Sequence, residues 1–249
     1  MDEALFREVD EYLEGLLVKE DASLRAALKA SEEAGLPPIQ VTPSQGKFLH
    51  LLARIVGARR ILELGTLGGY STIWLARALP RDGRLVTLEL NAAHAAVAQV
   101  SLRNAGVADR VEIRLGRAVD TMAKLAAERV EPFDLTFIDA DKPSTLEHFD
   151  AAVRLSRPGS VIVVDNVVRQ GTVARAADPD PSVRGMRRFL ERLANDSRVS
   201  AVASQTVGRK GYDGFVLAVV GSSPTALPAS NRRRSTRRPR RGATASREG

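Results

Sequence analysis

Two apolar segments of the sequence are each followed by polar residues of the kinds found in metal and catalytic sites. The run FDLTFI precedes Asp139 and Lys142, and the run VIVV precedes Asp165 and Asn166. If both runs are parallel strands of one open sheet, their carboxyl ends lie at the edge where ligands bind. Two carboxylates and one amide oxygen suit Mg²⁺, or else Ca²⁺ or Mn²⁺, and suit zinc poorly. The pattern predicts a divalent cation bound by Asp139, Asp165 and Asn166, with Lys142 beside it.

A second candidate site lies in the segment from Arg60 to Asn91, which has the pattern strand, glycine turn, helix, strand. Gly65, Gly68 and Gly69 allow a tight turn and let a ligand approach the backbone, and the helix that follows begins with unpaired N–H groups. Glu89 ends the second strand, where a carboxylate can accept the hydroxyls of a ribose. These features together predict a nucleoside-containing cofactor.

The spacing of the glycines excludes a dinucleotide fingerprint. Counted from Gly65, the second and third glycines of G-x-G-x-x-G are replaced by Leu67 and Tyr70. The segment instead reads E-L-G-T-x-x-G-Y-S, with an acidic residue 24 positions after Gly65. It resembles motif I of class I S-adenosylmethionine (SAM)-dependent methyltransferases, in particular the catechol and caffeoyl-CoA O-methyltransferases. A glycine turn after the first strand also occurs in α/β domains of other functions, so the loop by itself leaves a purely structural role open.

The resemblance extends over residues 35–220 and implies a role for each matching position. Glu63 and the glycine loop would hold the methionine part of SAM, which Val41 would also contact. Glu89 would bind the ribose. The loop Gly116 to Ala118 would border the adenine. In this family the positions of Asp139, Asp165 and Asn166 bind a divalent metal, and that of Lys142 is the catalytic base. We therefore expect the catalytic residues to be Lys142 and Asp139, and the cofactor-binding residues to be Val41, Glu63, Gly65, Thr66, Gly69, Tyr70, Ser71, Glu89, Ala118 and Asp139.

The chemistry that these residues predict is methyl transfer to a weakly nucleophilic hydroxyl. A phenol has a pKa of about 10, so little phenolate exists at neutral pH. A divalent ion near that oxygen favours its ionised form, much as zinc does for water. We expect a cation-dependent O-methyltransferase that acts on a vicinal dihydroxy aromatic or a similar small molecule. The long polar loop Val167 to Pro181 is expected to shape its substrate pocket.

The alternation of apolar runs and helical patterns predicts an α/β fold of the Rossmann-like, doubly wound type. We expect a seven-stranded mixed sheet with an antiparallel last strand, in one domain over residues 1–221. Residues 2–33 have the spacing of one amphipathic helix, within an N-terminal helical cover of residues 1–34 that is a candidate homodimer contact. The segment GRKGYDG is predicted to be the turn of the last hairpin. From Ser222 to Gly249 the composition predicts a disordered, arginine-rich tail.

The net charge of +7 belongs to this tail. Residues 231–249 contain eight arginines and one glutamate, and the other residues carry 29 basic and 29 acidic side chains. There are no cysteines, and no apolar run is long enough to span a membrane. We therefore expect a cytoplasmic protein without disulfides.

Other functions stay open at this stage. Some relatives of this group methylate a hydroxylated uridine of tRNA, and the tail could bind nucleic acid through its charge. A nicotinamide dehydrogenase is the weakest alternative, and the sequence has no G-x-S-x-G or Walker motif that would favour a hydrolase or a P-loop protein. His50, His94 and His148 lack a second ligand at metal spacing and are expected to be structural or surface residues. The sequence does not name the acceptor, the methylated position or the ion.

Overall fold

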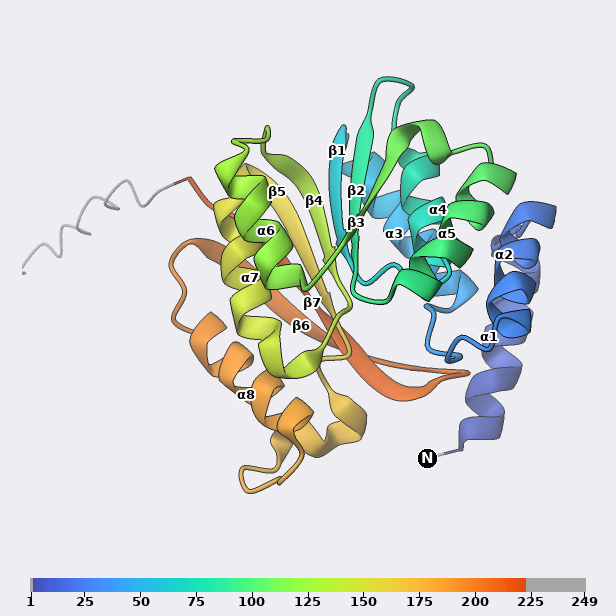
Figure 1. Ribbon diagram of the computed structural model, residues 1–249. Helices are drawn as coiled ribbons and strands as arrows, with labels where there is room; N and C mark the ends of the chain where they lie inside the picture. The colour runs from blue at the N-terminus through green and yellow to red at the C-terminus, as the bar shows by residue number, and fades with distance from the viewer. Residues whose placement is uncertain (1, 223–249) are drawn as a thin grey trace, which may run out of the picture.

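The computed structural model describes residues 2–222 and consists of a seven-stranded sheet between two layers of helices (Figure 1). The strand order is β3-β2-β1-β4-β5-β7-β6. The first five strands are parallel, and β7 is antiparallel to both β5 and β6. The predicted doubly wound mixed sheet with an antiparallel last strand is thus confirmed. The proposed tail lies almost wholly outside the described residues.

The strands are β1 (Arg60–Leu64), β2 (Arg84–Glu89), β3 (Val111–Leu115), β4 (Phe133–Ile138), β5 (Ser156–Asp165), β6 (Val199–Gly208) and β7 (Gly211–Val220). The helices are α1 (Glu3–Leu17), α2 (Ala22–Glu33), α3 (Pro43–Ile55), α4 (Tyr70–Ala78), α5 (Ala92–Asn104), α6 (Ala118–Ala127), α7 (Thr145–Arg154) and α8 (Pro181–Leu193). Three short 3₁₀ segments connect them, η1 (Ala108–Arg110), η2 (Lys142–Ser144) and η3 (Arg169–Ala174).

Each face of the sheet has its own apolar core. On one face, side chains of the central strands pack with Met122, Phe149 and Phe189 of α6, α7 and α8. On the other face they pack with Leu49 and Ile73 of α3 and α4, and with residues of α2 and α5. Because both faces are covered, β4 is buried along its whole length, as is usual for a parallel sheet with helices on both sides. This core fixes the positions of the strand ends at which the polar residues lie.

The N-terminal segment differs from the prediction of one helix over residues 2–33. Two helices form, because Asp21 begins a new one by accepting a hydrogen bond from the backbone N–H of Leu24 (3.0 Å). Ser23 also donates to the Asp21 carboxylate (2.9 Å). Aspartate is a preferred N-cap residue, because its side chain accepts a hydrogen bond from a backbone N–H of the first helical turn that has no partner within the helix. The periodic leucines concealed this cap.

Two further differences lie near the site. Residues 145–154 form helix α7, which was not predicted. The turn predicted for GRKGYDG is much shorter, since β6 runs to Gly208 and β7 starts at Gly211. Gly211 has φ +87°, so glycine permits a hairpin with only Arg209 and Lys210 at its tip.

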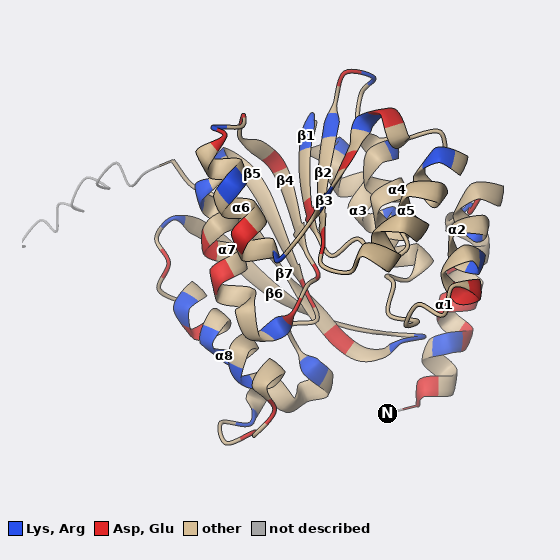
Figure 2. Cartoon of the chain, in the orientation of Figure 1, with Lys and Arg blue, Asp and Glu red and all other residues tan. Residues whose placement is uncertain are grey.

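Charged residues are distributed over most elements, with basic positions frequent along α8 (Figure 2). None of the helices formed by residues 2–222 has the length and apolar character needed to cross a bilayer.

Candidate active site

A cavity of about 770 Å³ lies beyond the carboxyl ends of the parallel strands. Most of the predicted site residues line it, together with parts of the α2–α3 connection and of the loop after β5. The predicted residues that line it are Val41, Gly65, Thr66, Tyr70, Ser71, Glu89, Ala118, Asp139, Lys142 and Asn166. Glu63, Gly69 and Asp165 are not among its lining residues.

The glycine loop at one end of the cavity is built against the end of β4. Gly65 has φ +96°, and a Cβ placed there would lie 2.1 Å from the backbone oxygen of Asp139. The Gly65 N–H donates to Leu88 O (2.9 Å), and the Asp139 N–H donates to Leu64 O (2.9 Å). Only glycine allows this approach, which joins the cofactor loop to the strand that carries Asp139.

Glu89 holds the same loop from the neighbouring strand. Its Oε2 accepts hydrogen bonds from the backbone N–H groups of Thr66 (3.2 Å) and Leu67 (2.9 Å). Its Oε1 accepts one from Asn91 N (2.9 Å), and His94 Nδ1 lies 3.7 Å away. The carboxylate lies at the cavity wall, where it can meet a ribose.

Glu63 lies one layer below the cavity and is fully buried. Its carboxylate accepts hydrogen bonds from Ser71 Oγ (2.7 Å), Thr72 Oγ1 (2.6 Å) and Thr87 Oγ1 (2.8 Å). Burial raises the pKa of Glu63 to about 7 against the effect of these three donors. The contact to Ser71, which does line the cavity, gives Glu63 an indirect part in shaping the site.

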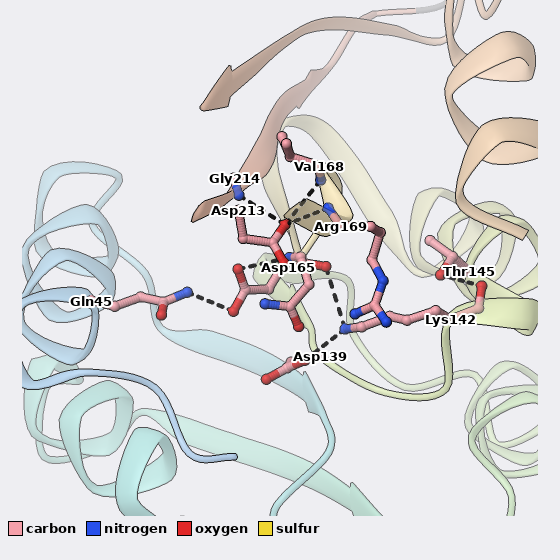
Figure 3. Close-up of polar contacts among 10 residues, drawn as sticks. Gln45, Asp139, Lys142, Thr145, Asp165, Val168, Arg169, Asp213 and Gly214 are labelled. Carbon is pink, nitrogen blue, oxygen red and sulfur yellow. Dashed lines mark hydrogen bonds and ion pairs between the residues drawn. The ribbon is translucent and has the colours of Figure 1, made fainter. Parts of the chain in front are cut away.

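Asp139, Lys142 and Asp165 converge beyond the ends of β4 and β5, where Asp139 and Lys142 line the cavity (Figure 3). Lys142 Nζ donates to Asp139 Oδ1 (2.7 Å) and to the backbone oxygen of Asp165 (3.3 Å). Burial, followed by the negative charge of Asp139, raises the pKa of Asp165 to about 6, although Lys142 acts in the opposite direction. The predicted group of acids and lysine is thus assembled from β4, η2 and β5.

Asn166 follows Asp165 in a left-handed backbone conformation, with φ +58°. This conformation is uncommon for a residue other than glycine and is tolerated best by asparagine. The backbone N–H of Asn166 donates to Asp165 Oδ1 (2.8 Å), and Asn166 lines the cavity. The turn therefore places Asn166 at the cavity directly after Asp165.

Several residues of the site were not singled out from the sequence. Gln45 Nε2, on α3, donates to Asp165 Oδ2 (2.6 Å) (Figure 3). Arg169 lines the cavity from η3. His94 and His148 also line it, and His148 Nε2 lies 3.7 Å from Asp141 Oδ1. The contact of Gln45 with Asp165 joins residues 120 positions apart, so no local spacing indicates it. His94 and His148, expected to be structural or surface residues, are instead placed at the cavity wall by the helices that carry them.

The sequence is similar to that of known O-methyltransferases over most of its length. Residues 16–218 match the O-methyltransferase family. A catechol O-methyltransferase of Niastella koreensis is 52% identical over 220 residues, which is 88% of this chain and 100% of that protein. One of Mycobacterium tuberculosis is 53% identical over 213 residues, 86% of this chain and 95% of that protein.

Solved structures agree in fold and cofactor. An O-methyltransferase of Bacillus cereus in complex with SAH has a TM-score of 0.86 and 51% identity, over 88% of this chain and 99% of that one. TomG, an O-methyltransferase of Streptomyces achromogenes in complex with SAM, has a TM-score of 0.86 and 53% identity, over 89% of this chain and 100% of that one. These relatives do not favour a tRNA-modifying or nucleic-acid-binding function. The chain belongs to the O-methyltransferase family, within its catechol and caffeoyl-CoA O-methyltransferase-like group, and is a SAM-dependent enzyme.

Proposed function

We propose that this enzyme methylates one hydroxyl of a vicinal dihydroxy aromatic with the help of a divalent cation. The observation that carries the proposal is that Asp139, Lys142 and Asn166 line the same cavity as the glycine loop and Glu89. A methyl donor bound along that loop and an acceptor bound at the acids would therefore face one another. The catechol O-methyltransferases among the relatives support this acceptor class.

The donor set fits a hard cation. Asp139, Asp165 and Asn166 offer carboxylate and amide oxygens, which Mg²⁺ and Ca²⁺ prefer. Asp165 is buried beside a second carboxylate, and the raised pKa shows that this arrangement disfavours two negative charges. A cation bound there would remove that penalty. Within residues 2–222 no three His, Cys, Asp or Glu side chains form a metal-sized group. The proposed site therefore takes its third protein oxygen from the amide of Asn166.

A divalent cation held by these three residues would supply positive charge that stabilises the ionised form of the acceptor hydroxyl. The other tasks belong to the chain itself. Asp139 fixes Lys142 through the 2.7 Å contact, which leaves the amine at the cavity wall. In its neutral form, Lys142 Nζ can accept the proton of the attacking hydroxyl.

Methyl transfer then forms one bond and breaks one. The acceptor oxygen attacks the methyl carbon of SAM, the bond from that carbon to sulfur breaks, and the products are a methyl ether and S-adenosylhomocysteine. The proton of the hydroxyl leaves with Lys142. Gly65 to Ser71 and Glu89 hold the donor, so the two reactants meet without the entropic cost of a bimolecular encounter.

The proposal is tested by turnover of SAM and catechol with Mg²⁺ and with a chelator. We expect Asp139→Ala to abolish methylation and Lys142→Gln to lower kcat by about 10²- to 10⁴-fold, the usual contribution of a general base. Asp141→Asn is the matched control, because Asp141 accepts a hydrogen bond from Ser144 N (3.2 Å) and is not part of the proposed cation site. Full activity of Asp139→Ala in the presence of chelator would refute the cation-assisted mechanism.

A further inference from the structure

One cationic side chain at the cavity has no partner. Arg169 lines the cavity, and its Nε is inaccessible to solvent. Within the described part of the chain, this nitrogen has no hydrogen-bond acceptor, and the guanidinium group forms no ion pair. Arg169 as a whole is partly exposed, but its Nε is shielded from water. A shielded donor without an acceptor is costly, because it has lost its hydrogen bonds to water. An anionic group of a ligand in this cavity would supply an acceptor for Arg169.

The backbone that presents Arg169 is held firmly. Arg169 and Gln170 have φ +54° and +55°, which is rare for two successive residues other than glycine. Asp213 Oδ1, at the start of β7, accepts hydrogen bonds from Val168 N (2.9 Å), Arg169 N (3.0 Å) and Gly214 N (2.9 Å) (Figure 3). Strained conformations of this kind persist where the surroundings enforce them, and they are common at functional sites.

The direction of the side chain indicates which ligand the guanidinium meets. In Figure 3 the Arg169 side chain extends from its loop toward Lys142, on the side of the acids. The nearby carboxylates already have other partners, since Asp139 binds Lys142 and Asp165 binds Gln45. Arg169 follows β5, whereas the glycine loop follows β1, and β4 lies between these two strands. Arg169 is therefore nearer the acceptor end than the cofactor loop.

We propose that Arg169 binds a carboxylate of the acceptor, so that the substrate is a vicinal dihydroxy aromatic that also carries a carboxylate on or near its ring. This inference rests on the proposed function and narrows its substrate class. A guanidinium group presents parallel N–H donors that match a carboxylate in a bidentate pair. A neutral catechol would leave Arg169 Nε without an acceptor, whereas an acidic one would supply a carboxylate to the guanidinium group.

The test compares two acceptors with the same diol, 3,4-dihydroxybenzoate and its methyl ester, in the presence of SAM and Mg²⁺. We expect the wild-type kcat/KM to favour the acid by about 10- to 100-fold, the usual effect of a charge-assisted hydrogen bond in a shielded site. Arg169→Gln should bring this ratio close to one, and Arg169→Lys should restore it in part. Arg175→Gln, an exposed arginine just after η3, should leave the ratio unchanged.

The possible outcomes separate this inference from the function on which it rests. If the wild type methylates acid and ester equally, or if Arg169→Gln leaves their ratio unchanged, the role of Arg169 is refuted and the proposed function stands. Weaker binding of SAM by Arg169→Gln, with an unchanged ratio, would assign Arg169 to the carboxylate of the cofactor and would also refute it. If SAM binds but neither diol is methylated, both proposals fail. The ratio measured for the wild type requires no variant, so the test does not depend on how well a variant folds.

Discussion

At the scale of single residues, Glu63 shows how burial and hydrogen bonding compete. Three hydroxyl groups donate to its carboxylate, which favours the charged form. Its complete burial in the parallel sheet acts in the opposite direction and prevails, so the pKa rises to about 7. Glu63 thus supports Ser71 and the cofactor loop at a cost in stability whenever it is ionised.

This balance predicts a pH dependence of folding. Between pH 4.5, near the pKa of the unfolded state, and about pH 7, the folded state keeps a proton on Glu63 that the unfolded state releases. The contribution of Glu63 to the free energy of unfolding therefore falls as the pH rises through this range. Relative to Glu63→Gln, the wild type should lose on the order of 3 kcal/mol of unfolding free energy between pH 4.5 and about pH 7. Above about pH 7 the difference between the two proteins should change little. Urea unfolding of both proteins at several pH values measures the difference, and parallel curves would contradict the assignment.

At the scale of elements, the tip of the β6–β7 hairpin is attached to α1. Arg209 Nη2 pairs with Glu14 Oε2 (2.6 Å), and the backbone N–H of Arg209 donates to Asp10 Oδ2 (2.7 Å). Glu14 Oε1 also accepts a hydrogen bond from Ser44 N at the start of α3 (3.1 Å). Glu14 is buried and joins α1 to α3 and to the β6–β7 hairpin.

Removal of this carboxylate should loosen the junction. Glu14→Ala leaves the Ser44 N–H and the Arg209 guanidinium without their acceptor, and the net contribution of such a hydrogen bond is about 0.5–1.5 kcal/mol. We expect a loss of stability of that size, measured by urea unfolding monitored by circular dichroism. Glu11→Ala, on the exposed side of the same helix, is the control and should change stability by less than about 0.5 kcal/mol. Equal stability of the two variants would show that the junction contributes nothing.

At the scale of the whole molecule, α1 leaves an apolar stripe exposed. The stripe consists of large side chains at helical spacing that are at least 43% accessible, namely Leu5, Val9, Tyr12, Leu13, Leu16 and Leu17. Exposed apolar surface of this extent is typical of an interaction site. It supports the homodimer expected from the sequence, which stays a prediction.

The dimer is tested by size-exclusion chromatography with light scattering. The pair of substitutions Val9→Glu and Leu16→Glu places charges within the stripe and should convert a dimer into a monomer. Val100→Glu on α5 changes a residue that is 49% exposed and should leave the dimer intact. A wild-type monomer, or a dimer that survives the double substitution, would exclude an interface through α1.

Local patterns in the sequence predicted the sheet, and most of the site residues that they indicate line the cavity. Asp139 and Asp165 end buried apolar runs, and the parallel topology then requires them to meet. Long-range contacts were not accessible in this way, such as Gln45 with Asp165 or Asp213 with Arg169. The division of the N-terminal helix depends on one cap at Asp21, which the regular leucine spacing outweighed. Helix α7 was missed although its pattern is amphipathic.

The most direct test of the account is calorimetric titration of catechol into the enzyme saturated with S-adenosylhomocysteine, which occupies the cofactor site without reacting. The account predicts that catechol binds in the presence of Mg²⁺, and that binding is lost with a chelator or in Asp139→Ala. Equal affinity with Mg²⁺ and with chelator would contradict the proposed role of Asp139, Asp165 and Asn166, and the enzyme would then be a methyltransferase that binds its acceptor without a cation.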